Sequence, residues 1–149
     1  MFGGVVVLVR YDFARTKAKM LQKGFKPPLD LEEIADRLGI KYHYHCLSGV
    51  DFSFSIKHGS QYIIGVSITG NQEEDRRAFA RQLGHIVLGH FELYDMDLLD
   101  EERLSDHDRD ILIQEADVFV EELLASTQRF LKVTRKSTGI PVLFLETFR

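Results

Sequence analysis

Apolar residues recur at helical spacing in four stretches, and these stretches predict the helical part of the fold. The apolar positions of residues 11–23 lie three or four apart, and Gly24 is a typical helix end. Asp30 is a suitable N-cap for a short helix over residues 31–38. Two longer helices are predicted, over residues 75–91 (DRRAFARQLGHIVLGHF) and roughly over residues 109–129. The first of these long helices is apolar on most sides and is expected to be mostly buried.

Three strands are predicted between the short helix and the first long helix. Residues 40–46 alternate loosely, residues 52–56 alternate cleanly between apolar and polar, and residues 62–68 form a third run. Turn-forming residues separate them, which favours an antiparallel meander. The expected fold class is α+β, with a small three-stranded antiparallel sheet packed with helices. Residues 95–110 are strongly acidic and are expected to form an exposed connection, while residues 1–9 and 130–149 allow more than one structure.

The composition places this pattern in an ordinary globular protein. With 149 residues, 44% of them apolar, the chain is expected to fold as a single domain over residues 1–149. A net charge of −4 provides no basic footprint, so direct binding of nucleic acid is not expected. The apolar stretch 3–9 is too short to span a membrane and lacks the features of a signal peptide. A single cysteine excludes an internal disulfide, and a cytoplasmic location is the resulting expectation.

Three polar residues stand among apolar ones on the two long helices. Arg81 and His85 lie four residues apart, so they share one face of the first long helix. Glu115 lies within the apolar face of the second long helix. Buried polar and charged groups need partners, so these three side chains are candidates for one site.

Four stretches carry a resemblance to a known family. They read PPLDLEEIADRLGI, GSQYIIGVSI, EEDRRAFARQLGHIVLGH and QEADVFVEELLAS, and together they cover about residues 27–126. Their order and content resemble the ImmA/IrrE family of zinc metallopeptidase domains, in which the third stretch is close to RFTLAHELGHLLLGH and the fourth to EANAFAAELLMP. The resemblance implies a zincin-like arrangement, in which two long helices frame a zinc ion. It also implies protein partners of the repressor-type transcription factor kind, which such proteases cut in phage, mobile-element and stress-response settings.

The chain departs from the family at the positions that carry the chemistry. A zinc peptidase of this kind needs H-E-x-x-H, in which two imidazoles bind the metal and the glutamate activates water. Here Arg81 stands at the first ligand position and Gln82 at the general-base position, while only His85 and Glu115 match ligand positions. A protonated guanidinium cannot bind a cation, and an amide cannot take a proton from water. No cofactor is therefore expected, because two protein ligands are too few for a catalytic zinc site.

We hypothesise that a charge network takes the place of the zinc ion. In it Arg81 pairs with Glu115, and His85 hydrogen-bonds to one or both of them. Arg81→Ala is then expected to destabilise the fold, and Arg81→His with Gln82→Glu to recreate zinc binding. The plainer interpretation is that Arg81 reaches solvent, that Gln82 faces the surface and that His85 is an ordinary core histidine. His90, five residues after His85, is assigned a structural role near the helix end.

Three classes of function are compatible with these features. The first is a pseudoenzyme, a metallopeptidase-like module that binds or regulates a protein partner, with the edge of the small sheet as a place where an extended peptide can add. The alternative is an active metal-dependent peptidase or hydrolase whose altered ligand set borrows His43, His45 or His107 and holds zinc. The third is a structural or assembly protein whose tail covers the sheet edge. Bound metal distinguishes the second class from the first.

Overall fold

The computed structural model of the protein describes residues 8–46, 53–99 and 104–138, with side chains as far as residue 125. The helices are α1 (Tyr11–Lys23), α2 (Leu31–Arg37), α3 (Gln72–Val87), the short α4 (His90–Leu93) and α5 (Asp106–Thr138). The strands are β1 (Lys41–His45), β2 (Phe54–His58), β3 (Gln61–Ser67) and the two-residue β4 (Leu98–Leu99). This content agrees with the predicted α+β class.

The sheet differs from the predicted one in strand number and direction. Its four strands lie in the order β1–β3–β2–β4. β2 and β3 form an antiparallel hairpin, but β1 pairs with β3 in parallel, and β4 adds to the outer side of β2. The prediction of a three-stranded antiparallel sheet is therefore wrong. β3 carries the longest buried run and takes a central position, and the alternation within β1 carries no information about the direction of its neighbour.

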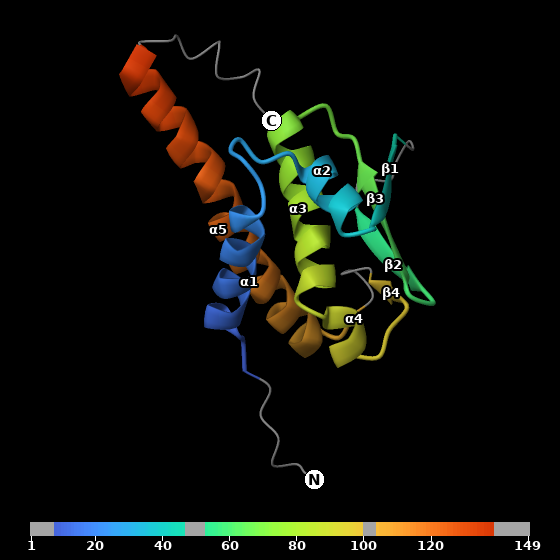
Figure 1. The fold of residues 1–149 in the computed structure, drawn as a ribbon. Coiled ribbons are helices and arrows are strands. Elements are labelled where there is room, and N and C mark those ends of the chain that lie inside the picture. Colours follow the sequence, from blue (N-terminus) through green and yellow to red (C-terminus); the bar gives the residue numbers. More distant parts are fainter. Residues whose placement is uncertain (1–7, 47–52, 100–103, 139–149) are drawn as a thin grey trace.

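The helices form layers on one face of this sheet. α3 packs against β3, and α1 and α5 pack together on the far side of α3 (Figure 1). α3 and α5 approach closely where Gly84 faces the ring of Phe119. A Cβ at Gly84 would lie only 2.8 Å from Cδ1 of that ring, so the close approach needs a glycine at this position. Both Phe119 and Leu83 belong to the fully buried core. The core is thus centred on α3, as its apolar sequence predicts.

The helix predicted over residues 75–91 begins and ends earlier than expected. α3 starts at Gln72, where Asn71 is the N-cap, and it ends at Val87. Gly89 then adopts the left-handed conformation with φ 76°, which glycine reaches without the steric cost that a side chain imposes. The chain turns at this residue, and α4 begins at His90. This turn determines where His90 points.

The remaining predicted elements match in part. α1 has the predicted bounds, α2 is one residue shorter, and Asp30 caps it as expected. The acidic residues 95–110 are not a simple connection, since they include β4 and the start of α5. Expectations for residues 1–7 and 139–149 lie outside the described residues. Among the helices that the structure describes, none combines the length and apolar content needed to cross a membrane.

Candidate functional site

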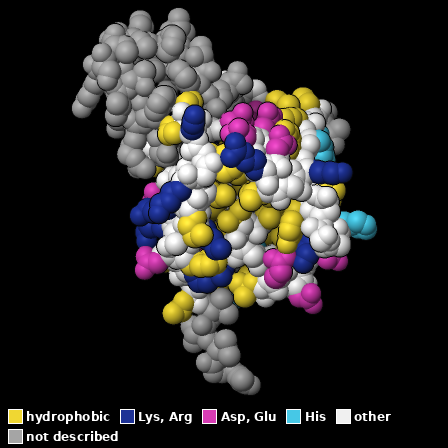
Figure 2. All heavy atoms as spheres, viewed as in Figure 1, with side chains coloured by type: hydrophobic (Ala, Val, Ile, Leu, Met, Phe, Trp, Pro, Cys, Tyr) yellow, Lys and Arg dark blue, Asp and Glu magenta, His cyan; other side chains and the backbone are white. Residues whose placement is uncertain are grey.

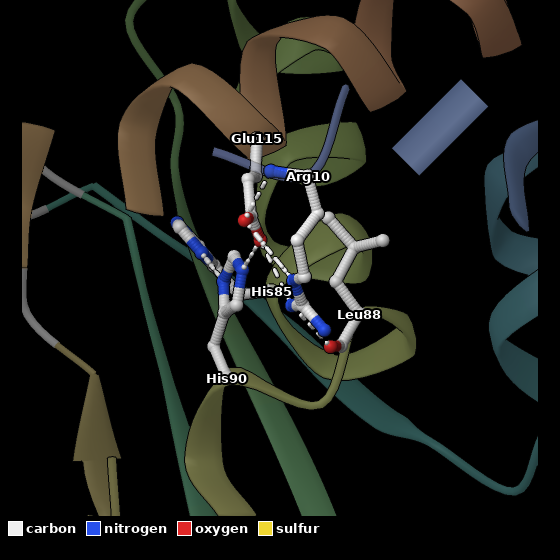
Figure 3. A network of polar contacts seen from close by, with 5 residues as sticks. All are labelled: Arg10, His85, Leu88, His90 and Glu115. Atoms are coloured by element: carbon white, nitrogen blue, oxygen red, sulfur yellow. Dashed lines mark hydrogen bonds and ion pairs between the residues drawn. The ribbon is translucent and has the colours of Figure 1, made fainter. Parts of the chain in front are cut away.

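Glu115 lies at the centre of a buried polar network between α5, the end of α3 and the segment that leads into α1 (Figure 3). Its side chain is 1% exposed, and His85 and His90 are fully buried. The carboxylate binds Arg10 on one side and His90 on the other, and His90 in turn contacts His85. These four residues are called the Glu115 network below.

Arg10 holds the carboxylate with three donor groups. Its backbone N–H donates to Oε2 of Glu115 at 2.8 Å, its Nε donates to Oε2 at 3.1 Å, and its Nη2 donates to Oε1 at 2.9 Å. Nη2 also donates to the carbonyl oxygen of Leu88 at 3.1 Å, which ties the network to the end of α3. The planar fork of a guanidinium matches a carboxylate, and such charge-assisted bonds are stronger than neutral ones. Arg10 therefore supplies the positive charge that compensates Glu115.

The two histidines form a chain of hydrogen bonds that ends on the carboxylate. Nε2 of His90 lies 2.9 Å from Oε1 of Glu115, and Nδ1 of His90 lies 2.8 Å from Nδ1 of His85. A carboxylate only accepts hydrogen bonds, so His90 carries its proton on Nε2. Burial lowers the pKa of His90, which leaves the ring neutral at pH 7. Nδ1 of His90 is then an acceptor, and Nδ1 of His85 donates to it.

The ionisation of Glu115 is set by its partners rather than by its burial. Burial alone raises the pKa of this carboxyl group, but the hydrogen bonds from His90 and Arg10 outweigh that effect and lower the pKa to about 2. At neutral pH the network thus combines an ionised carboxylate, a guanidinium and a neutral His90. The guanidinium of Arg10 balances the charge of the carboxylate without any further cation.

The turn at Gly89 explains why His90 belongs to the network. On a continuous helix, residues five apart are rotated by about 140° and face different directions. Because α3 ends at Val87 and Gly89 is left-handed, His90 returns toward His85 instead. The contact with His85 was not part of the structural role near the helix end that was predicted for His90. The glycine directly before it is the one signal in the sequence that points to this contact.

The direct ion pair predicted between Arg81 and Glu115 is not formed. Nη2 of Arg81 donates to Oδ1 of Asp117 at 2.6 Å, in a pair whose side chains are 35% and 45% exposed. Glu115 and Asp117 are two residues apart on α5, so they lie on different sides of that helix. Arg81 meets the half-exposed carboxylate, where both charges keep contact with water and the desolvation cost is small.

Gln82 faces the sheet, in contrast to the plainer interpretation that placed it at the surface. Its side chain is 2% exposed. Oε1 accepts a hydrogen bond from the hydroxyl of Ser55 at 2.7 Å, and Nε2 donates to the carbonyl oxygen of Ser53 at 3.4 Å. The amide at the general-base position is thus used to fasten α3 to β2, and it offers no group that accepts a proton from water.

The histidines considered as substitute ligands lie on other elements. His43 and His45 are on β1, and both rings pack against Phe54. His107 is exposed in the first turn of α5. Over residues 8–46, 53–99 and 104–125, no group of three His, Cys, Asp or Glu side chains is arranged to hold a metal ion.

The Glu115 network does not fit a zinc ion. Both carboxylate oxygens of Glu115 accept from the guanidinium of Arg10, whose positive charge repels a metal cation at the same place. Both ring nitrogens of His90 are engaged, one with Glu115 and one with His85. A metal site needs one lone pair from each ligand directed at a common point, and here the donors and acceptors are paired with one another instead.

The comparisons with protein-family models and with curated proteins found no match to this chain. Its function therefore has to be inferred from its own residues and their geometry.

Proposed function

We propose that this chain is a metallopeptidase-like domain without peptidase activity, which acts in the cytoplasm as a protein-binding or regulatory module. The observation that carries the proposal is the pairing of Glu115 with Arg10 and His90. At the position where the resemblance implies a metal-binding carboxylate, the charge of that carboxylate is already compensated within the chain. The network then stabilises the fold by joining the segment before α1 to α3, α4 and α5.

The residue at the general-base position supports the same proposal. Peptide hydrolysis by a metal-bound water needs a group that takes a proton, with a pKa near the working pH. Gln82 has no such group, and its amide is occupied by Ser55 and Ser53. The neighbouring residue Arg81 is paired with Asp117. Neither of the two residues that depart from H-E-x-x-H is available for catalysis.

The sheet supports a partner-binding role at one of its two edges. The edge of β2, beside Gln82, is taken by β4, where Ser55 opposes Leu99. An extended peptide therefore cannot add to β2 while β4 is in place. The outer edge of β1 has no strand on it among the described residues. A protein partner is proposed for this module, and a repressor-type transcription factor is the kind that the resemblance implies.

Metal content and hydrolysis test the proposal together. The full chain is purified without chelators, incubated with zinc, passed over a desalting column and measured by elemental analysis, and the same sample is assayed on fluorescent casein. We expect less than about a tenth of an equivalent of zinc and no chelator-sensitive cleavage. One retained equivalent together with chelator-sensitive cleavage would overturn the proposal in favour of the active peptidase.

A designed variant makes the test sharper. Arg81→His with Gln82→Glu restores the H-E-x-x-H sequence but leaves Arg10 and His90 on Glu115. The sequence alone predicts that this variant binds zinc, whereas the geometry predicts that it stays below about a tenth of an equivalent. A full equivalent in the variant would show that the network yields readily to a metal ion.

A further inference from the structure

A groove opens at the end of α3 that lies away from the Glu115 network. It is formed by the first turns of α2 and α3 and by the ends of β1 and β3, and its volume is about 640 Å³. Tyr44 of β1 and Ile68, which follows β3, line it and are each 43% exposed. Such exposed apolar side chains beside a cavity provide contact area for a partner.

The strand beside this groove has an unpaired edge among the described residues. β1 is the outermost strand and pairs with β3 on its inner side only. The amide of Ile68 donates to the carbonyl oxygen of His45, so the backbone groups of His45 face β3. Backbone groups alternate in direction along a strand, so those of Tyr42 and Tyr44 face outward. They offer a peptide the hydrogen bonds that a further strand would use.

The groove is acidic. The described lining includes the carboxylates of Asp30 and Glu32 at the start of α2 and that of Asp75 on α3. Among the described residues that line the groove, Arg76 is the one cation, and its Nη2 donates to the carbonyl oxygen of Leu29. Figure 2 shows acidic side chains gathered over α2, the helix that borders the groove. The charge of the lining is complementary to a basic side chain.

The side chains of β1 indicate which face of an added strand would meet this charge. Tyr42 and Tyr44 both lie against Phe79 of α3, so they share the helix-covered face of the sheet. The hydroxyl of Tyr44 donates to Glu32, which places an acidic group on the helix-covered face of the sheet, next to β1. In an extended peptide paired with β1, every second side chain would point toward this face, about 7 Å from the next.

We propose that the groove and the outer edge of β1 bind an extended segment of a partner protein, with a Lys or Arg side chain in the acidic groove and an apolar side chain against Tyr44 and Ile68. This inference rests on the proposed function, since it names the kind of partner that the inactive module holds. The partner adds as a further strand next to β1. Its backbone supplies affinity and its basic side chain supplies specificity.

Fluorescence anisotropy with three labelled seven-residue peptides tests this interaction on the full chain. The first alternates Lys with Val, the second has Glu in place of Lys, and the third is the Lys peptide with N-methyl groups on alternate backbone amides. We expect saturable binding of the first that weakens with salt, and at least about tenfold weaker binding of the other two. Equal binding of the Lys and Glu peptides, or full binding of the N-methyl peptide, would overturn the proposal.

Two matched charge reversals locate the site. Glu32→Lys places a positive charge in the groove, whereas Glu73→Lys makes the same change on an exposed residue in the first turn of α3 that does not line it. We expect about a tenfold loss of affinity for the Lys peptide with Glu32→Lys and less than about a twofold loss with Glu73→Lys. Equal losses would refute the site. Circular dichroism before each titration confirms that the variant is folded.

The result is separable from the test of the proposed function. Zinc content and casein cleavage report on the Glu115 network, and peptide anisotropy reports on the groove, so either can fail alone. A second copy of the chain is the competing occupant of the β1 edge. Sedimentation equilibrium that shows a dimer from which the Lys peptide is excluded would replace the proposed partner by self-association.

Discussion

Arg10→Met is the change that most directly tests the Glu115 network. Methionine keeps only the unbranched apolar stem of the side chain, so the substitution also removes the contact of the guanidinium carbon with Phe13, whose ring centre lies 4.4 Å from it. The substitution removes the positive charge and the bonds of Nε and Nη2, while the backbone N–H of residue 10 still donates to Glu115. It therefore leaves a buried carboxylate whose principal remaining partner is His90.

The expected loss of stability follows from the burial of the two partners. Removing one side of a buried ion pair costs about 3–5 kcal/mol, because the other charge stays buried without compensation. The side chain of Arg10 is 34% exposed and His90 keeps its bond to Glu115. The loss of stability is therefore expected to be at or below the lower end of this range, about 3 kcal/mol. The lowering of the Glu115 pKa from its ordinary value of 4.5 to about 2 corresponds to a net stabilisation of the ionised carboxylate by about 3 kcal/mol, after the opposing effect of burial. We expect Arg10→Met to lower the free energy of unfolding by about 2–3 kcal/mol at pH 7.

The same reasoning predicts how the effect depends on pH. The pKa of Glu115 is lower in the folded state than in the unfolded state, so the unfolded chain binds more protons in acid. The stability that ionised Glu115 contributes is complete above pH 4.5 and is lost as the pH falls through about 2. In Arg10→Met this pKa moves up toward its ordinary value. The difference in stability between wild type and variant should therefore be largest near neutral pH and should narrow between pH 4.5 and about 2.

Urea unfolding followed by circular dichroism measures the free energy of unfolding, and a series of such experiments from pH 7 to pH 2 measures its pH dependence. The control is Arg15→Met, which makes the same substitution in an exposed i,i+3 pair with Asp12 and should change the free energy of unfolding by less than about 0.5 kcal/mol. An Arg10→Met variant as stable as the Arg15→Met control would refute the reasoning. So would a large difference that stays constant from pH 7 to pH 2.

Three further predictions follow from the same structure. Arg81→Met should cost about 1 kcal/mol or less in urea unfolding, because the pair it breaks is half-exposed, and a loss as large as that of Arg10→Met would contradict this assignment. Gly84→Ala should lower the melting temperature, although alanine favours helices. The added Cβ forces the buried ring of Phe119 to move, at a cost of about 1–3 kcal/mol. An increase in the melting temperature would show that the ring relaxes freely. Long-range ¹H–¹⁵N spectra at pH 7 should show the Nε2–H tautomer for His90 and a proton on Nδ1 of His85, and an imidazolium pattern for His90 would contradict the neutral ring.

The bounds of the first two helices were predicted closely from the pattern of apolar and capping residues. The period of apolar residues predicted α1 with its observed bounds, and the capping residue Asp30 located the start of α2. The direction of β1 was not predictable in this way. A strand shows the same alternation whether its neighbour is parallel or antiparallel, and it does not reveal that β3, and not β2, is the neighbour of β1.

The candidate site was predicted from the sequence only in part. His85 and Glu115 were identified as buried polar groups because each stands among apolar residues on a long helix, and both are buried. Arg10 was missed because it precedes α1 directly and carries no periodic signal, and its partner lies 105 residues away. Helical spacing paired Arg81 with His85, but only the crossing of α3 over α5 decides which carboxylate Arg81 meets, and that carboxylate is Asp117.

The long separation between Arg10 and Glu115 has a consequence for how this chain acquires its structure during synthesis. Arg10, His85 and His90 all leave the ribosome before Glu115, which is 105 residues after Arg10. Until then the nascent chain lacks the carboxylate that satisfies two of these groups, and burying them alone is costly. Contacts of such long range close late and slow the overall reaction. A nascent chain arrested ahead of α5 should therefore stay sensitive to proteases, and protection should appear only after α5 has been made.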